Sequence, residues 1–196
     1  MKRIFLAACA ALCLTFTIAG GTMAKDDKPR VKLQTNMGDI VLEPEPKLTP
    51  ITVKNFLGYV KSGHYDGTVF HRVIRGFMIQ GGNFKIDLNR RSTDATIPNE
   101  AHLGLPNERG TIAMARTGDP HSASDQFFIN MVFNGLLNHR SKTSSRAWGY
   151  TAFGRVVEGM NIASRISRVP TGRVGPFPSD VPLSPVIVRK ATILEE

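Results

Sequence analysis

Cysteine is scarce in this chain of 196 residues, which contains Cys9 and Cys13 and no other cysteine. Both lie within the first 24 residues. If that segment is removed from the mature protein, no thiol remains to form a disulfide, to act as a nucleophile or to bind zinc. The mature chain must therefore use other side chains for any chemistry it performs.

Long apolar runs are absent beyond the N-terminus. Lys2 and Arg3 precede an uncharged run over residues 4–18, and the small residues Thr22 and Ala24 follow it. The run is shorter than the roughly 20 residues that cross a bilayer as a helix. This pattern is typical of a secretory signal peptide. We expect residues 1–24 to be cleaved after Ala24, the mature protein to reach the periplasm, and no stable membrane insertion.

Two alternatives to a periplasmic location remain open. Leu6-Ala7-Ala8-Cys9 has the local form of a lipid-attachment box, although few apolar residues precede it, so a lipid-anchored form is one alternative. Secretion beyond the cell envelope is the other. In each case residues 25–196 have the length of a single domain with a sizeable core.

Acidic residues are fewer than basic ones, and the formal net charge is +9. Removal of residues 1–24 takes away two basic residues and no acidic one, which leaves +7. The basic residues are scattered from Arg30 to Lys190 and form no run of like charge. Nucleic-acid binding needs a basic stripe with interleaved aromatic residues, so we do not expect it.

The hydrophobic pattern predicts a mainly β domain. Alternation on both sides of residues 36–39 predicts a β-hairpin. Thr49 as cap and Pro50 in the first turn predict a helix that ends at Gly63, and a weaker helix is expected over residues 158–166. Further strands are expected within 68–80, 111–115, 127–132, 152–157 and 186–194, with the proline-rich residues 170–185 as a surface loop. The pattern alone leaves a sandwich and a closed barrel open.

The stretch VFHRVIRGFMIQGGNF, residues 69–84, places an arginine among apolar residues. Strict alternation would put Phe70, Arg72 and Ile74 on one strand face and His71 on the other. Arg72 then either covers apolar surface with its stem or is a fixed hydrogen-bond donor in a dry site. We expect His71 to be structural or on the surface, and not a general base.

Three segments carry a resemblance to a known family. FHRVIRGFMIQGGN, GTIAMARTGDPHSASDQFFIN and FGRVVEGM together resemble the cyclophilin-type peptidyl-prolyl cis-trans isomerases, above all the exported bacterial members. The resemblance implies a closed eight-stranded antiparallel β-barrel capped by two α-helices. It also implies rotation about Xaa-Pro bonds, a reaction that needs neither a cofactor nor a metal, because no bond is made or broken.

The resemblance also implies roles for particular residues. An amide resists rotation because its nitrogen lone pair is delocalised, and a donor near the prolyl nitrogen would stabilise the twisted state. Arg72 matches that donor, and Gln80 would align it. The expected substrate-binding residues are Phe77, Met78, Ala115, Arg116, Thr117, Gln126, Phe128, Leu136, Leu137 and Tyr150. A non-catalytic chaperone module that only holds proline-containing peptides is the alternative, but it would have no need for Arg72.

The sequence departs from many relatives in two places. Leu136 stands where eukaryotic members carry tryptophan, so we expect weak binding of cyclosporin-type inhibitors. The segment 138–150 is longer than its counterpart in most relatives and adds Arg140, Lys142 and Arg146. A solvated loop is the simpler interpretation, and steering of acidic segments is the other. The expected partners are proline-containing segments of unfolded exported proteins, with the protein itself a monomer.

Overall fold

The computed structural model describes residues 28–194, so the predicted signal peptide and both cysteines lie outside the described residues. The helices are α1 (Pro50–Lys61), α2 (Ser145–Trp148) and α3 (Met160–Ile166), with a 3₁₀ turn at Gly135–Leu137. The strands are β1 (Arg30–Thr35), β2 (Gly38–Pro44), β3 (Thr68–Val69), β4 (Arg72–Ile74), β5 (Met78–Gly81), β6 (Thr111–Met114), β7 (Phe127–Asn130), β8 (Ala152–Glu158), β9 (Thr171–Val174), β10 (Phe177–Pro182) and β11 (Ile187–Leu194).

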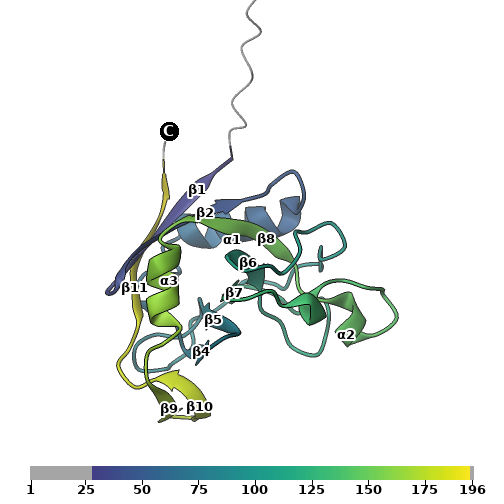
Figure 1. Cartoon of the computed structure of the whole chain (residues 1–196). Coiled ribbons are helices and arrows are strands. Elements are labelled where there is room, and N and C mark those ends of the chain that lie inside the picture. Colours follow the sequence, from purple (N-terminus) through teal and green to yellow (C-terminus); the bar gives the residue numbers. More distant parts are fainter. Residues whose placement is uncertain (1–27, 195–196) are drawn as a thin grey trace, which may run out of the picture.

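Nine of the described strands form one sheet in the order β3-β11-β1-β2-β8-β6-β7-β5-β4, with antiparallel neighbours. The two strands at its ends, β3 and β4, belong to one segment in which Phe70 and His71 alone separate them. The same segment therefore forms both edges, and the sheet curls round on itself (Figure 1). The predicted mainly β, antiparallel architecture is confirmed, with β3 and β4 together as one interrupted strand of the expected eight.

The interruption between β3 and β4 corrects the predicted alternation. Phe70 and Val73 are both buried in the interior of the sheet, whereas Arg72 is exposed. Strict alternation would have put Phe70 beside Arg72. It fails because Phe70 and His71 leave the strand geometry, and the Phe70 N–H donates to the carbonyl of Val186. A turn at residues 75–77 then separates β4 from β5.

The two predicted helices, α1 and α3, both bury apolar residues in the interior of the sheet. Val53, Phe56 and Val60 of α1 belong to the same apolar cluster as Ala163 and Ile166 of α3. α2 was not predicted. It is one turn long and lies away from α1 and α3, at the right of the molecule in Figure 1.

The predicted cap of α1 is wrong in its chemistry. Thr49 occupies the N-cap position, but its side chain makes no capping hydrogen bond. The buried carboxylate of Glu100 instead accepts the N–H groups of Ile51 and Thr52 at 3.2 and 2.8 Å, and the Thr52 hydroxyl at 2.7 Å. A distant acidic residue thus satisfies the N–H groups that a helix leaves free in its first turn.

The proline-rich residues 170–185 are not a plain loop, as the sequence had suggested. β9 and β10 pair as a two-stranded sheet around Gly175, which has a φ of +54°. Proline is tolerated here because each strand of a two-stranded ribbon has an outer edge that needs no N–H donor. This hairpin lies beside β4, at the lower end of the molecule in Figure 1.

Buried apolar residues form separate clusters on the two faces of the curled sheet. The larger fills the interior, with side chains such as Leu33, Phe127 and Phe153. The smaller lies on the outer face and is built on Met78, Ala113, Phe128 and Ala152. No helix among the described residues is long and apolar enough to span a membrane. The outer cluster is the part of the fold that positions the candidate site.

Replacement of Glu100 tests the cap of α1. We expect Glu100→Ala to lower the free energy of unfolding by about 1–3 kcal/mol, because two buried donors of Thr52 and the partly buried N–H of Ile51 lose their acceptor. Thr49→Ala is the matched control and should cost less, since Thr49 does not cap the helix. Urea denaturation followed by circular dichroism measures both, and equal losses for the two variants would contradict the role given to Glu100.

Candidate functional site

The site is built on one row of residues that crosses four strands. Arg72 of β4 pairs with Gln80 of β5, Gln80 pairs with Phe128 of β7, and Phe128 pairs with Ala113 of β6. Directly opposed residues in a sheet point to the same face, so these side chains share the outer face. The row brings one basic, one amide and one aromatic side chain together beside a small residue.

A cavity of about 310 Å³ lies over this row. Met78 and Phe128 in its floor are 2% and 4% exposed, and the small side chain of Ala113 beneath them leaves the space unfilled. Every residue that lines the cavity was predicted from the sequence: Arg72, Phe77, Met78, Gln80, Ala115, Arg116, Phe128, Leu137 and Tyr150. The cavity is thus apolar at its base and polar along one side.

Arg72 lies at the rim of the cavity, and not in a dry interior. Its side chain is 48% exposed, and its Nε lies 4.0 Å from a carboxylate oxygen of Asp180, which is 37% exposed. Arg72 also lines a neighbouring hollow of about 390 Å³, which Gln126 and Asp180 share. Asp180 was missed in the sequence because it lies in the segment interpreted as a surface loop.

Gln80 and Gln126 form one unit. The Gln80 side-chain amide donates to the side-chain oxygen of Gln126 at 3.0 Å. Gln126 lines the hollow beyond Arg72 and not the 310 Å³ cavity. Gln80, expected to align Arg72, and Gln126, expected to bind substrate, are thus in direct contact.

Leu136 and Leu137 are placed differently from what the resemblance implied. Leu137 lines the 310 Å³ cavity, whereas Leu136 is 67% exposed and lines a larger hollow of about 890 Å³, together with Thr117. Both lie in the 3₁₀ turn, where successive side chains point about 120° apart. Leu137 therefore reaches both spaces, whereas Leu136 lines the larger hollow and not the 310 Å³ cavity.

Arg116 connects the site to the segment 138–150. Its Nε donates to the carbonyl of Gly149 at 3.0 Å and one terminal nitrogen donates to the carbonyl of Ser145 at 2.7 Å. Its guanidinium carbon lies 4.4 Å from the centre of the Tyr150 ring. The segment therefore contains α2 and packs on Arg116 along one side, while Arg140, Lys142 and Arg146 are exposed, as a solvated loop would have them.

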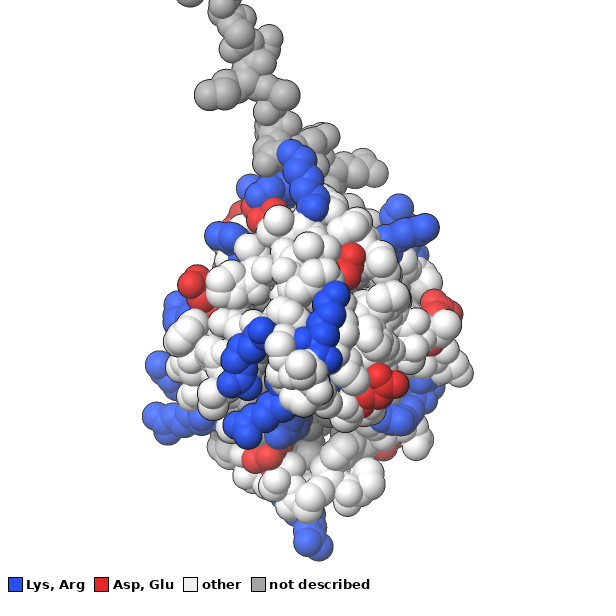
Figure 2. Space-filling model, turned by 90° about the vertical axis from the view of Figure 1, so that its right-hand side faces the viewer, with Lys and Arg blue, Asp and Glu red and all other residues white. Residues whose placement is uncertain are grey.

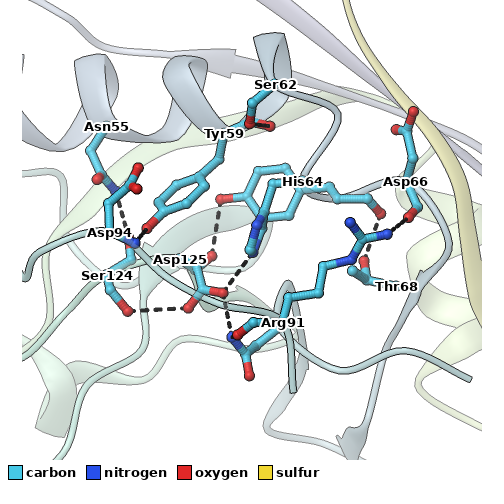
Figure 3. Close-up of polar contacts among 12 residues, drawn as sticks. Asn55, Tyr59, Ser62, His64, Asp66, Thr68, Arg91, Asp94, Ser124 and Asp125 are labelled. Carbon is cyan, nitrogen blue, oxygen red and sulfur yellow. Dashed lines mark hydrogen bonds and ion pairs between the residues drawn. The ribbon is translucent and has the colours of Figure 1, made fainter. Parts of the chain in front are cut away.

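A buried polar network supports the residue that precedes Gln126. The Asp125 carboxylate is within hydrogen-bond distance of His64 Nε2 at 2.7 Å and of Ser124 Oγ at 3.1 Å, and it accepts the Asn83 amide (Figure 3). The carbonyl of Asp125 accepts the Tyr65 hydroxyl at 2.9 Å. These contacts fix the chain next to both Gln80 and Gln126. In the sequence, the only signal for this network was Asp125 before QFF, because partners such as His64 lie far along the chain.

His71 is buried, as a structural residue would be. Its ring lies 4.5 Å from the ring of Phe84 and 5.9 Å from that of Phe177, which anchors the β9–β10 hairpin. Its Nδ1 is buried and has no hydrogen-bond partner among the described residues. Burial, with smaller contributions from the nearby Arg72 and Arg90, lowers the pKa of His71 to about 4. The imidazole is therefore neutral at pH 7.

Nothing in the described part of the chain groups three or more His, Cys, Asp or Glu side chains in a way that could hold a metal ion. The cavity and Arg72 at its rim offer two kinds of binding. An apolar cavity can bind a small ring by burial, and a cationic donor at its rim can bind a polar atom of the same ligand.

The comparisons with known proteins agree on one family. Residues 30–193 match the family described as "Cyclophilin type peptidyl-prolyl cis-trans isomerase/CLD". "Peptidyl-prolyl cis-trans isomerase cyp18" of Streptomyces antibioticus is 55% identical over 164 residues, which cover 84% of this chain and 98% of that protein. "Peptidyl-prolyl cis-trans isomerase A" of Dickeya dadantii is 45% identical over 196 residues, which cover 100% of this chain and 99% of that protein.

Solved structures give the same result. A crystal structure of a Cryptosporidium parvum cyclophilin type peptidyl-prolyl cis-trans isomerase superimposes with a TM-score of 0.70 at 27% identity and covers 86% of this chain and 99% of its own. A second structure of that protein was determined in the presence of the dipeptide ala-pro, with a TM-score of 0.69 at 26% identity, covering 85% of this chain and 99% of its own.

The pKa of His71 predicts how stability changes with pH. Between pH 6.5 and 4 the unfolded chain takes up a proton at this residue and the folded chain does not. We therefore expect the free energy of unfolding to fall as the pH drops through 6.5, by up to about 3 kcal/mol from this residue once the pH is below 4. His71→Phe should remove this part of the acid sensitivity, and urea denaturation at several pH values measures it.

The exposed His102 gives the matched control, since His102→Gln should leave the acid sensitivity in place. A nuclear magnetic resonance titration of the imidazoles is a second measurement. A midpoint near 6.5 for His71 would contradict the lowered pKa.

Proposed function

The chain belongs to the cyclophilin-type peptidyl-prolyl cis-trans isomerases, and on that premise we propose that Arg72 is its catalytic donor and that the 310 Å³ cavity is its proline site. The chain has peptidyl-prolyl cis-trans isomerase activity (EC 5.2.1.8) and binds proline-containing peptides. Its fold is the cyclophilin fold. The observation that carries the assignment of the site is an arginine at the rim of a cavity with an apolar base.

The reaction requires a group that binds the twisted amide better than the planar one. The planar amide is held by a rotation barrier of about 18–20 kcal/mol, because the nitrogen lone pair is shared with the carbonyl. Twisting returns that pair to the nitrogen, where it can accept a hydrogen bond. A guanidinium N–H of Arg72 directed at the prolyl nitrogen then stabilises the transition state and not the ground state.

The cavity floor holds the proline ring while the preceding carbonyl turns. Phe77, Met78, Phe128 and Leu137 surround the ring and bind it by burial of apolar surface. The bound ring stays fixed on one side of the rotating bond, so the rotation is confined to the other side. Positioning of this kind lowers the entropic part of the barrier.

Asp180 and Gln80 orient Arg72 in this proposal. Asp180 faces Arg72 from the β9–β10 hairpin and has a φ of +65°, in the left-handed region that L-residues rarely adopt. Phe177 of the same hairpin packs on His71 and Phe84, which holds the hairpin against β4. Substrate binding at the rim would cover Arg72 and strengthen its hydrogen bond.

The substrate backbone runs along the residues where β6 leaves the sheet. Ala115 donates its N–H to the carbonyl of Gln126, and Arg116 and Thr117 continue in extended chain beside the cavity. We assign the substrate residue before the proline to this edge of the sheet. Gln126 then lies on one side of that residue, and Tyr150 closes the cavity on the other.

Export is the second part of the proposal. The sequence of residues 1–24 has the form of a cleaved signal peptide, and residues 25–196 then form a single isomerase domain. The relative from Dickeya dadantii matches over the whole of this chain, that N-terminal segment included. The substrates are then proline-containing segments of exported proteins that fold in the periplasm, where the monomeric enzyme accelerates an exchange that otherwise takes tens to hundreds of seconds.

Substitution of Arg72 tests the mechanism. We expect Arg72→Ala to lower kcat/KM for a short Xaa-Pro peptide about a hundredfold or more, which corresponds to roughly 2.7 kcal/mol of lost transition-state stabilisation. Arg72→Lys should restore only part of the activity, because an ammonium group lacks the planar fork of the guanidinium. A protease-coupled isomerisation assay measures the rates.

Asp180→Asn keeps the shape of the side chain and removes its charge. If Asp180 only orients Arg72, this variant should lose activity about tenfold or less, and the loss should disappear in the Arg72→Ala background. If Arg72→Ala and the unmodified enzyme had equal rates, the role of Arg72 as the catalytic donor would be contradicted.

Leu136 predicts weak inhibition by cyclosporin-type peptides. Its side chain offers no N–H group and is largely exposed, so we expect Kd values well above the low-nanomolar range. Leu136→Trp should tighten binding about tenfold or more, equal to about 1.4 kcal/mol. Isothermal titration calorimetry measures the affinity, and low-nanomolar inhibition of the unmodified enzyme would refute the prediction.

A further inference from the structure

We propose that the hollow of about 890 Å³ next to the proline site binds a large apolar side chain of the substrate, from a residue two positions before or after the proline, with preference for an acidic residue beside it. This proposal rests on the proposed function, because it names the substrate class of the same enzyme. The preferred substrate is then a proline-containing segment that carries an aromatic or long aliphatic residue and a carboxylate close to the proline.

The hollow is continuous with the proline site. Phe77, Arg116, Leu137 and Tyr150 line both spaces. A peptide whose proline ring occupies the smaller cavity must therefore pass its neighbouring residues into or over the larger one. The occupant of the hollow is consequently part of the same polypeptide, and not a separate ligand.

Apolar side chains of the hollow are left exposed. Phe133 and Leu136 are each 67% exposed, which is unusual for residues of this size next to an apolar cavity. Burial of such surface is favourable by about 25 cal/mol for each Å² removed from water. A large apolar side chain of the substrate would cover both residues at once, whereas a small or polar one would not.

The apolar floor is already in place. The Phe133 ring lies on Gly135, where a Cβ atom would come within 2.7 Å of it, so the glycine makes room for the ring. The Asn134 side chain donates to the carbonyl of Phe77 at 3.1 Å and to the side-chain oxygen of Asn130 at 2.7 Å. The floor therefore needs little rearrangement to receive a side chain, which keeps the entropic cost of binding low.

The opposite wall is the segment that contains α2. Arg116 holds it through the carbonyls of Ser145 and Gly149, and the Ser144 hydroxyl caps the helix by accepting the Ala147 N–H at 3.2 Å. The hollow is thus bounded by two parts of the chain that are each fixed by their own hydrogen bonds.

The charge of the hollow favours an acidic neighbour. Arg116 and Arg146 line it, and no acidic side chain does within the described residues. Arg116 is occupied by carbonyls of its own chain, which leaves Arg146 as the cation on the wall. On the face of the molecule seen in Figure 2, basic side chains lie near the middle and around the edge, with fewer acidic ones scattered among them. A carboxylate beside the apolar residue would meet this charge.

The experiment compares three kinds of peptide that share one Ala-Pro core. The first has only small neutral residues around the core, the second has one phenylalanine two residues from the proline, placed on either side in separate peptides, and the third adds a glutamate beside that phenylalanine. The enzymes are the full mature chain and the variants Phe133→Ala and Arg146→Gln. Arg140→Gln is the matched control, because Arg140 lies on the same segment but does not line the hollow.

We expect the unmodified enzyme to isomerise the phenylalanine peptide about tenfold faster in kcat/KM than the small peptide, for one of the two placements. Phe133→Ala should abolish that gain and leave the rate on the small peptide unchanged. Arg146→Gln should abolish only the further gain from glutamate, which should itself shrink at high salt. Arg140→Gln should behave as the unmodified enzyme.

Two results would overturn the proposal. One is a rate on the phenylalanine peptides that equals the rate on the small peptide, and the other is a gain that survives in Phe133→Ala. Chemical-shift changes at residues 133–137 on addition of the phenylalanine peptide are a second measurement, and their absence would also contradict it. Failure of the proposed function is distinct, since the unmodified enzyme would then fail on the small peptide.

Discussion

The site depends on one strand register. Gln80 is paired with Arg72 on one side and with Phe128 on the other, and this row determines which side chains reach the outer face of the sheet. A shift of one residue would exchange Gln80 for Ile79 and send the amide into the apolar interior. The interior and the site therefore stabilise the same pairing, because apolar residues such as Ile79 and Ile129 are buried only when the site residues face outward.

Much of the architecture could be predicted from local pattern. The main strands and the helices α1 and α3 have apolar spacing that is visible over a few residues, and the quoted motifs contain every residue that lines the small cavity except Leu137 and Tyr150. The predictions failed where a partner lies far away in sequence. Glu100 caps α1 in place of Thr49, and Phe70 turns inward because its N–H binds Val186. Neither contact leaves a mark in the neighbouring residues.

The same reason explains which site residues were missed. Arg72 and Gln80 stand in a motif, whereas Asp180, whose carboxylate lies 4.0 Å from Arg72, comes from a proline-rich hairpin. Asp125 also stands in a quoted motif, but its partner His64 lies outside the motifs. Their carboxylates are matched to cations and donors on other segments, and such matching appears only when the chain is folded. The structure thus adds to the motif residues the groups that hold them in place.

The closure of the sheet by residues 68–74 has a consequence for the order in which the molecule can be completed. Val69 pairs with Ile187, which belongs to β11, the last strand of the chain (Figure 1). A nascent chain that still lacks β11 can pair neither β3 nor β1 on that side. Arg72 lies three residues after Val69, so it acquires its final surroundings only after residues 187–188 have been synthesised. Pairing over such long sequence separations is also slow, so an enzyme that accelerates the folding of others reaches its own active form late.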